Sequence, residues 1–293
     1  MARVRYATAI TFSPEVERAV DGIRAVLGSP SIGRIQPHIT LIPPGEATPD
    51  ELGTLLWELA GVASTMGPFE LRLGGLDVFL NRRTIGYLRV EDVEGVLHSL
   101  GAKLQRGHRE FVPHVTVAES APLDLLNQIS RASREMSLEA RAERISLLLA
   151  DLRDPKRRWR PLVAARFGYG GRRIRSGIEC RVMAVEGWEE GVPSRRPSTA
   201  VLALHQERGV LAEAVAHDIG RGFHEIVRVR VFDPDDRGFG LGGLVLSELL
   251  ELVGTAVAAD SPFFRRYLLE EVSTALASAI GLGPVAGWVM RSR

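Results

Sequence analysis

Two short segments of the sequence carry side chains that could do acid–base chemistry. Residues 37–41 (PHITL) and 113–117 (PHVTV) each place a histidine and a threonine two positions apart in an apolar run, directly after a proline. Side chains at positions i and i+2 of a β-strand leave the same face of the sheet. Each segment therefore predicts a strand that presents one imidazole and one hydroxyl together.

Two imidazoles and two hydroxyls suit phosphodiester chemistry without a metal. Histidine titrates near neutral pH, so one ring can accept a proton from a nucleophile while a second, protonated ring donates one to the leaving oxygen. Threonine hydroxyls can donate hydrogen bonds to phosphate oxygens on which charge develops. A single histidine on a strand is more often a core residue. Two matched copies favour a catalytic role for His38, Thr40, His114 and Thr116.

The elements expected around the two motifs repeat with the spacing of the two histidines, which are 76 residues apart. In both copies apolar periodicity predicts a helix, a histidine strand and a further helix. Pro43 and Pro44 are expected to end the first histidine strand. Such a duplicated unit would bring His38 and His114 to face each other across a cleft. The expected segments are helix 14–27, strand 34–42 and helix 48–59 in the first copy, and 92–106, 110–118 and 122–134 in the second.

Composition sets the broad class of the protein. The chain has 293 residues, 45% of them hydrophobic, with a net charge of +1, which predicts two globular domains. Cys180 is the single cysteine and has no Cys/His cluster nearby, so neither an internal disulfide nor a zinc site is expected. Without a signal peptide or an apolar span long enough for a bilayer, we expect a cytoplasmic protein with no membrane partner.

The second half is organised around a glycine-rich loop. Residues 169–177 resemble a linker, and four strand-like runs follow as an antiparallel meander. The last run leads into a loop at 233–243 and an apolar helix at 244–253. A glycine-rich loop before a helix exposes backbone N–H groups that suit a pyrophosphate. The Gly-x-Gly-x-x-Gly pattern at 238–243 fits a dinucleotide fingerprint, but an acidic lead-in and antiparallel strands upstream do not fit that fold.

The two histidine segments resemble the paired motifs of the 2H phosphoesterase superfamily, which includes 2′-5′ RNA ligase-like proteins and RNA 2′,3′-cyclic phosphodiesterases. The resemblance covers about residues 1–168. It implies a bilobal fold, no cofactor and hydrolysis of a 2′,3′-cyclic phosphate on an RNA end or a small nucleotide. It further implies catalysis by the four residues named above. Neither histidine is assigned as base or acid at this point.

The second half resembles the GNAT N-acetyltransferases through Arg-x-x-Gly-x-Gly at 237–242 and Asp-x-x-Phe-x-x-x-Tyr at 260–267. The resemblance implies acetyl-CoA as a ligand. The segment before the second strand is too short for the two helices that usually form the acceptor site, so a domain that only packs against its neighbour is the alternative. The implied ligand-binding residues are Arg237, Gly238, Phe239, Gly240, Leu241, Gly242, Gly243 and Tyr267.

Together these observations predict an α+β protein: a duplicated, bilobal 2H phosphoesterase domain with antiparallel sheets at 1–168, a linker at 169–177 and a smaller GNAT-like α/β domain at 178–293. The expected function is metal-independent cyclic phosphodiester hydrolysis fused to an acyl-CoA-binding domain. The alternative is an N-acetyltransferase whose N-terminal domain binds a nucleotide or RNA without cleaving it. The oligomeric state stays open.

Overall fold

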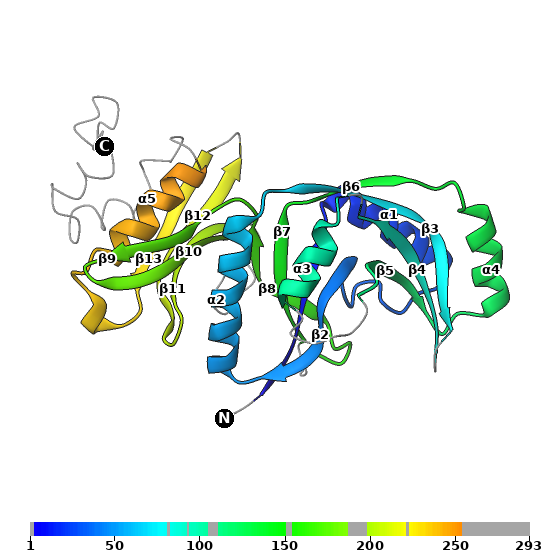
Figure 1. Ribbon diagram of the computed structural model, residues 1–293, viewed down its shortest axis with the longest axis horizontal. Helices are drawn as coiled ribbons and strands as arrows, with labels where there is room; N and C mark the ends of the chain where they lie inside the picture. The colour runs from blue at the N-terminus through cyan, green and yellow to red at the C-terminus, as the bar shows by residue number, and fades with distance from the viewer. Residues whose placement is uncertain are drawn as a thin grey trace. The chain divides into compact units, whose positions relative to one another are not determined.

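The computed structural model describes residues 3–80, 83–92, 94–104, 111–150, 154–186, 198–220 and 223–253 (Figure 1). The chain divides into two compact units. The first unit consists of Met1–Pro49 and Met66–Leu162, and the second of Asp50–Thr65 and Val163–Arg293. Residues 50–65 and 163–168, which the sequence analysis placed in the first domain, thus belong to the second unit.

The first unit is built on one antiparallel sheet with the strand order β7-β1-β2-β5-β4-β3-β6. Its strands are β1 Val4–Thr11, β2 His38–Ala47, β3 Phe69–Leu80, β4 Thr84–Glu91, β5 His114–Glu119, β6 Leu138–Ala142 and β7 Arg144–Ala150. Its helices are α1 Pro14–Val26, α3 Val96–Leu104 and α4 Leu123–Ala132, and β8 Trp159–Arg166 leads into the second unit.

The predicted repeat is visible in the element order, which runs β1-α1-β2-α2, with α2 at Pro49–Thr65, and then β4-α3-β5-α4. Helix α1 begins as expected, because the Ser13 hydroxyl accepts a hydrogen bond from the Val16 amide and Pro14 occupies the first turn. Helix α1 packs against β5, and α3 packs against β2. Each helix thus covers the histidine strand of the other copy.

Strand β2 differs from the sequence prediction at its end. It continues through Pro43 and Pro44 to Ala47 and stays paired with β1, where the partners shift register between Ile42 and Gly45. Proline lacks the amide hydrogen that a regular ladder needs, and a bulge removes that need locally. The prediction that the two prolines end the strand was therefore wrong.

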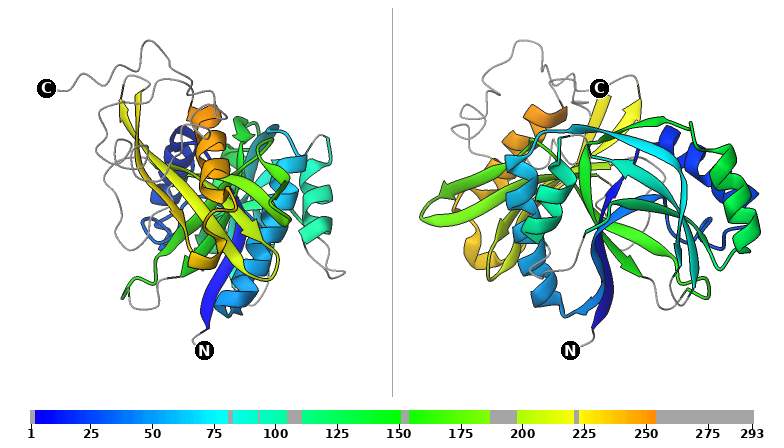
Figure 2. Two further views of the ribbon diagram at one scale, coloured as in Figure 1. Left: turned by 90° about the vertical axis from the view of Figure 1, so that its left-hand side faces the viewer. Right: turned by 45° about the vertical axis from the view of Figure 1, so that its right-hand side comes forward.

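The second unit contains the predicted antiparallel meander, β10 Ile178–Glu186, β11 Ser198–His205, β12 Gly209–Gly220 and β13 Phe223–Val231. Helix α5 Leu241–Val253 lies across one face of it, as the two views of Figure 2 show. Part of the expected linker forms strand β9 Gly171–Arg175, which pairs with β10.

Helix α2 Pro49–Thr65 contacts β10 through Arg181. The guanidinium of Arg181 donates a hydrogen bond to the Trp57 carbonyl at 2.8 Å and lies 4.2 Å from the centre of the Trp57 ring. Cys180 and Val182, which alternate with Arg181 along the strand, belong to the apolar core under α5. The two helices therefore contact residues that point to opposite faces of the meander.

A close backbone approach in the first unit yields a stability prediction. Gly75 of β3 lies against the end of α4, and a Cβ atom there would sit 2.3 Å from the Ser133 carbonyl oxygen. We expect Gly75→Ala to lower the free energy of unfolding by about 1–3 kcal/mol, the usual cost of overpacking. Gly67→Ala is the matched control because nothing lies within 4 Å of its Cβ position. Equal melting temperatures for the two variants would contradict this account.

Candidate active site

The two predicted motifs lie side by side on paired strands. Ile39 of β2 is the direct antiparallel partner of Val115 of β5, and both side chains are fully buried. This register places His38 opposite Thr116 and Thr40 opposite His114. Because neighbouring positions alternate between faces, all four side chains leave the face opposite to Ile39 and Val115. The structure thus brings the four predicted residues together on one sheet face, half-buried, with the two imidazoles on a diagonal.

The two histidine rings are held in the same way. His38 Nδ1 lies 2.8 Å from the Gln36 carbonyl oxygen, and His114 Nδ1 lies 2.8 Å from the Val112 carbonyl oxygen. A carbonyl oxygen can only accept, so Nδ1 carries the proton in both rings. In the neutral form, Nε2 is then left as the basic nitrogen on each ring. The spacing of the acceptor, two residues before each histidine, is a second repeated feature of the motifs.

The surroundings of the two rings differ. Burial lowers the pKa of His38 to about 4, and the positive charges of Arg24 and His114 act in the same direction, while the hydrogen bond to Gln36 opposes them. His114 instead contacts two aromatic rings edge to face, Phe79 at 5.1 Å and Tyr87 at 5.5 Å between centroids. The structure therefore favours a neutral His38 at physiological pH and a His114 ring fixed in its plane by aromatic neighbours.

Neighbouring strands extend this face with residues that the sequence analysis did not single out. Arg89 of β4 is the direct partner of His114, and Tyr87 is the partner of Thr116. On the other side Thr11 of β1 is the partner of His38, and its hydroxyl lies 2.8 Å from the Ser146 hydroxyl. Alternation within each strand could have placed these residues on one face, but only the register between strands shows that it is the face of the histidines.

A buried arginine was also missed by the sequence analysis. Arg24 of α1 is only 1% exposed, and its guanidinium donates hydrogen bonds to the carbonyl of Thr116. Its position within an apolar helical pattern gives no signal that it reaches a histidine strand.

No metal-binding cluster accompanies these residues. In the part of the chain that the structure describes, no three His, Cys, Asp or Glu side chains are grouped so that they could hold a metal ion. Cys180 is a free, buried thiol in the second unit. Among the described helices, none is both long and apolar enough to cross a membrane.

The predicted ligand loop of the second unit is exposed in its first part and buried in its second part. Residues 237–240 are exposed, and Gly238 and Gly240 have positive φ angles of 88° and 78°. Leu241, Gly242 and Gly243 are buried in the first turn of α5. Only the first part of the loop therefore offers exposed backbone to a ligand. Tyr267 and Asp260 lie outside the described residues.

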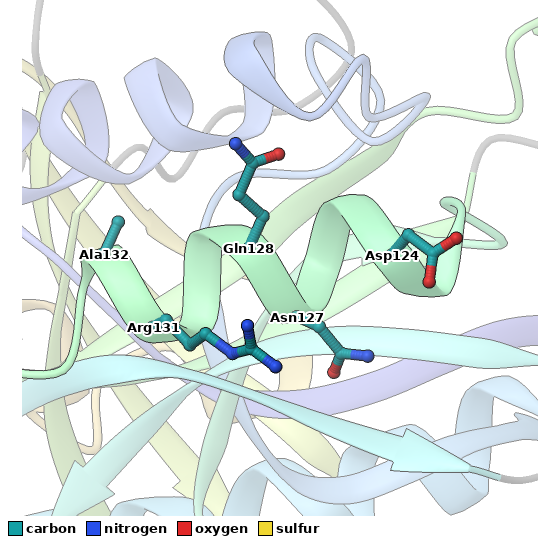
Figure 3. A pocket seen from close by; sticks show the side chains of 5 residues that line it. All are labelled: Asp124, Asn127, Gln128, Arg131 and Ala132. Atoms are coloured by element: carbon teal, nitrogen blue, oxygen red, sulfur yellow. The ribbon is translucent and has the colours of Figure 1, made fainter.

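A polar hollow lies on α4. Figure 3 shows its five side chains around the exposed side of the helix, with Gln128 pointing away from Asn127 and Arg131. None of the four motif residues lines it, and all five of its residues are exposed. This hollow is separate from the candidate active site. Its lining residues are Asp124, Asn127, Gln128, Arg131 and Ala132.

Comparison with known proteins bears on the first unit. Residues 12–154 match the family model described as the 2′-5′ RNA ligase superfamily. The comparisons support this superfamily for the N-terminal part of the chain. A Bacillus cytotoxicus protein named "Putative phosphoesterase" is 34% identical over 96 residues, which cover 31% of this chain and 55% of that protein. An Oceanobacillus iheyensis protein of the same name is 28% identical over 153 residues, 50% of this chain and 89% of its own length.

The chain spans about half the length of the first of these relatives. Solved structures give a weaker likeness. Escherichia coli LigT, crystallised with 3′-AMP, is 21% identical with a TM-score of 0.46 and covers 57% of this chain and 100% of its own. A protein of Thermus thermophilus is 22% identical with a TM-score of 0.44, covering 56% and 98%. These matches give no support to a GNAT domain in the second half.

The buried environment of His38 predicts a pH dependence. Its folded pKa of about 4 lies below the value near 6.5 of an unfolded chain. Between these values the unfolded state binds more protons, so stability falls as the pH drops from about 6.5 to about 4. NMR titration of the His38 ring should show a midpoint well below 6, and His38→Asn should flatten this part of the stability curve. A His38 midpoint near 6.5 would contradict the burial seen here.

Proposed function

We propose that the N-terminal part of the chain hydrolyses a 2′,3′-cyclic phosphate, on an RNA end or a small nucleotide, to a 2′-phosphate. The observation that carries the proposal is the Ile39–Val115 register, which sets two His–Thr pairs on one sheet face. The family match over residues 12–154 supports phosphoesterase chemistry in the same segment. The four side chains fit a tetrahedral phosphate that needs two proton transfers and two hydrogen-bond donors.

The different surroundings of the two histidines indicate which one acts as base and which as acid. His38, kept neutral by burial, accepts a proton from water at Nε2 as the water oxygen forms a bond to phosphorus. The bond from phosphorus to the 3′ oxygen breaks, and protonated His114 donates its Nε2 proton to that oxygen. The hydroxyls of Thr40 and Thr116 donate hydrogen bonds to the non-bridging oxygens. One water is consumed, and the two histidines exchange protonation states before the next cycle.

The proposed substrate is a 2′,3′-cyclic phosphate, a group that an RNA end and a small cyclic nucleotide share. Arg89 lies exposed beside His114 on this face, and the stacked rings of Phe79 and Tyr87, 3.9 Å apart, form the wall next to it. A cation and aromatic side chains suit a nucleotide better than a neutral ester. The turn at 154–158, which is rich in basic residues, contains Arg158, which pairs with Asp154. It supports no choice between the two substrates.

Loss of either histidine should lower the turnover rate strongly. With a 2′,3′-cyclic nucleotide as substrate, we expect His38→Ala and His114→Ala each to lower kcat by about 10²–10⁴-fold, the usual contribution of a positioned acid or base. Thr40→Val and Thr116→Val should lower kcat less, by about 10–10³-fold. His98→Ala, an exposed histidine paired with Asp92, should keep wild-type activity.

Phosphorus NMR of the product distinguishes the 2′-phosphate from the 3′-phosphate. A folded wild-type protein that binds the cyclic nucleotide without turning it over would instead support the alternative function, an acetyltransferase whose N-terminal part only recognises a nucleotide or RNA.

Acyl-CoA binding by the second half stays a separate prediction. Its support is the order of β13, the exposed glycine loop and α5. The residues between β13 and the loop are held by Arg208, which pairs with Asp233 and Asp236. A ligand that binds only the folded state raises the melting temperature. We expect acetyl-CoA to raise it, and Gly240→Pro to remove that rise. No change at millimolar acetyl-CoA would exclude the GNAT-like interpretation.

A further inference from the structure

We propose that Arg24 of α1 is a positioning residue that ties the two His-x-Thr motifs into one site. The inference deepens the proposed function and rests on it, because it assigns a role within the same site. Arg24 is 1% exposed, although arginine is rarely buried without a strong reason. Its contacts give the reason.

One guanidinium reaches the backbone of the second motif and of the turn before the first motif. Nε and Nη2 donate hydrogen bonds to the carbonyl oxygen of Thr116, at 3.3 and 3.0 Å. Nη1 donates to the carbonyl oxygen of Ile35 at 2.8 Å. The next residue, Gln36, provides the carbonyl that orients His38 Nδ1. The planar, rigid fork of arginine therefore fixes the strand of the second motif against the turn that leads into the first.

Strand pairing alone only weakly fixes the position of the second motif relative to the turn before the first. β2 and β5 share one directly registered residue pair, Ile39 with Val115, whereas β1 and β2 share a long ladder. A short ladder specifies the distance between the two histidines poorly. Three charge-assisted hydrogen bonds from Arg24, two to Thr116 of β5 and one to Ile35 before β2, supply the missing constraint.

The charge of Arg24 has a second effect on the site. Arginine stays protonated inside proteins, and its positive charge adds to the burial that lowers the pKa of His38. The charged groups that face Arg24 are Asp21, its hydrogen-bond partner at 3.1 Å, Glu17 on the same helix and Glu119 of β5. Arg144 lies close enough to Glu17 to affect that carboxylate.

The second copy of the repeated unit has no arginine at the position equivalent to Arg24. The spacing of 76 residues between the two histidines places Leu100 at the equivalent position, and Leu100 is fully buried in α3. An arginine therefore stands behind the second motif and a leucine behind the first. Only one of the two matched copies therefore places a buried positive charge at this helix position.

Two substitutions separate the geometry from the charge. Arg24→Lys keeps a positive charge but loses the planar fork, and Arg24→Met loses both. We expect both to lower kcat about 10–100-fold, the typical cost of losing a group that orients a catalytic residue. NMR titration should show a higher His38 pKa in Arg24→Met and a value close to wild type in Arg24→Lys. Leu100→Ala, the matched core control, should lose stability without moving the His38 pKa.

Asp21→Asn covers the case in which Arg24→Met does not fold. Asp21 is 39% exposed at its side chain, so this variant should fold, and it leaves the charge of Arg24 without its closest counter-charge. The His38 pKa should then fall below its wild-type value. Wild-type kcat in folded Arg24→Lys, or a His38 pKa unmoved in Asp21→Asn, would overturn the proposal. Because the titrations need no substrate, they test Arg24 even if the wild-type protein hydrolyses no cyclic nucleotide.

Discussion

The backbone pairing of Ile39 with Val115 is the constraint on which the rest of this structure depends. These two apolar side chains are buried on one face of the sheet, and the residues on either side of them must then leave the other face. A slip of one residue in either strand would turn its histidine and threonine into the core. Burial of two aliphatic side chains thus decides where all four reactive groups lie.

Helix packing supports this pairing from behind. Each copy of the repeated unit contributes the helix that covers the other copy's histidine strand, so neither motif is complete without both copies. The carbonyls at Gln36 and Val112 then fix the two rings in the same tautomer. Burial separates the rings chemically, because it lowers the pKa of His38 while His114 lies among aromatic side chains. The site is symmetric in its backbone and asymmetric in its surroundings.

Much of this was predictable from the sequence, because it rests on local patterns. Alternation predicted the histidine strands and the meander, and the Ser13-Pro14 start predicted α1. The sequence could not predict the register between β2 and β5, which long-range packing sets. It predicted that the two rings face each other across a cleft, and it gave no indication that they lie on neighbouring strands of one sheet. Arg24 was missed because only the tertiary structure shows what a buried arginine contacts.

The second unit shows a different limit. Its strands followed from apolar runs, but the glycine-rich segment expected as a linker pairs as β9, because a flexible composition does not prevent backbone hydrogen bonding to a neighbouring strand. The loop before α5 has the predicted place in the chain, yet three of its seven proposed ligand-binding residues are packed into the helix start. Composition indicated a loop there and could not indicate which of its amides remain exposed.

The central claim is that both imidazoles contact one phosphate. The most direct measurement is a ¹⁵N NMR titration of the wild-type protein with adenosine 2′-monophosphate, following Nε2 of His38 and of His114. Both resonances are expected to move together and to fit 1:1 binding with one shared dissociation constant. A response from only one of the two rings, or two different binding curves, would contradict it.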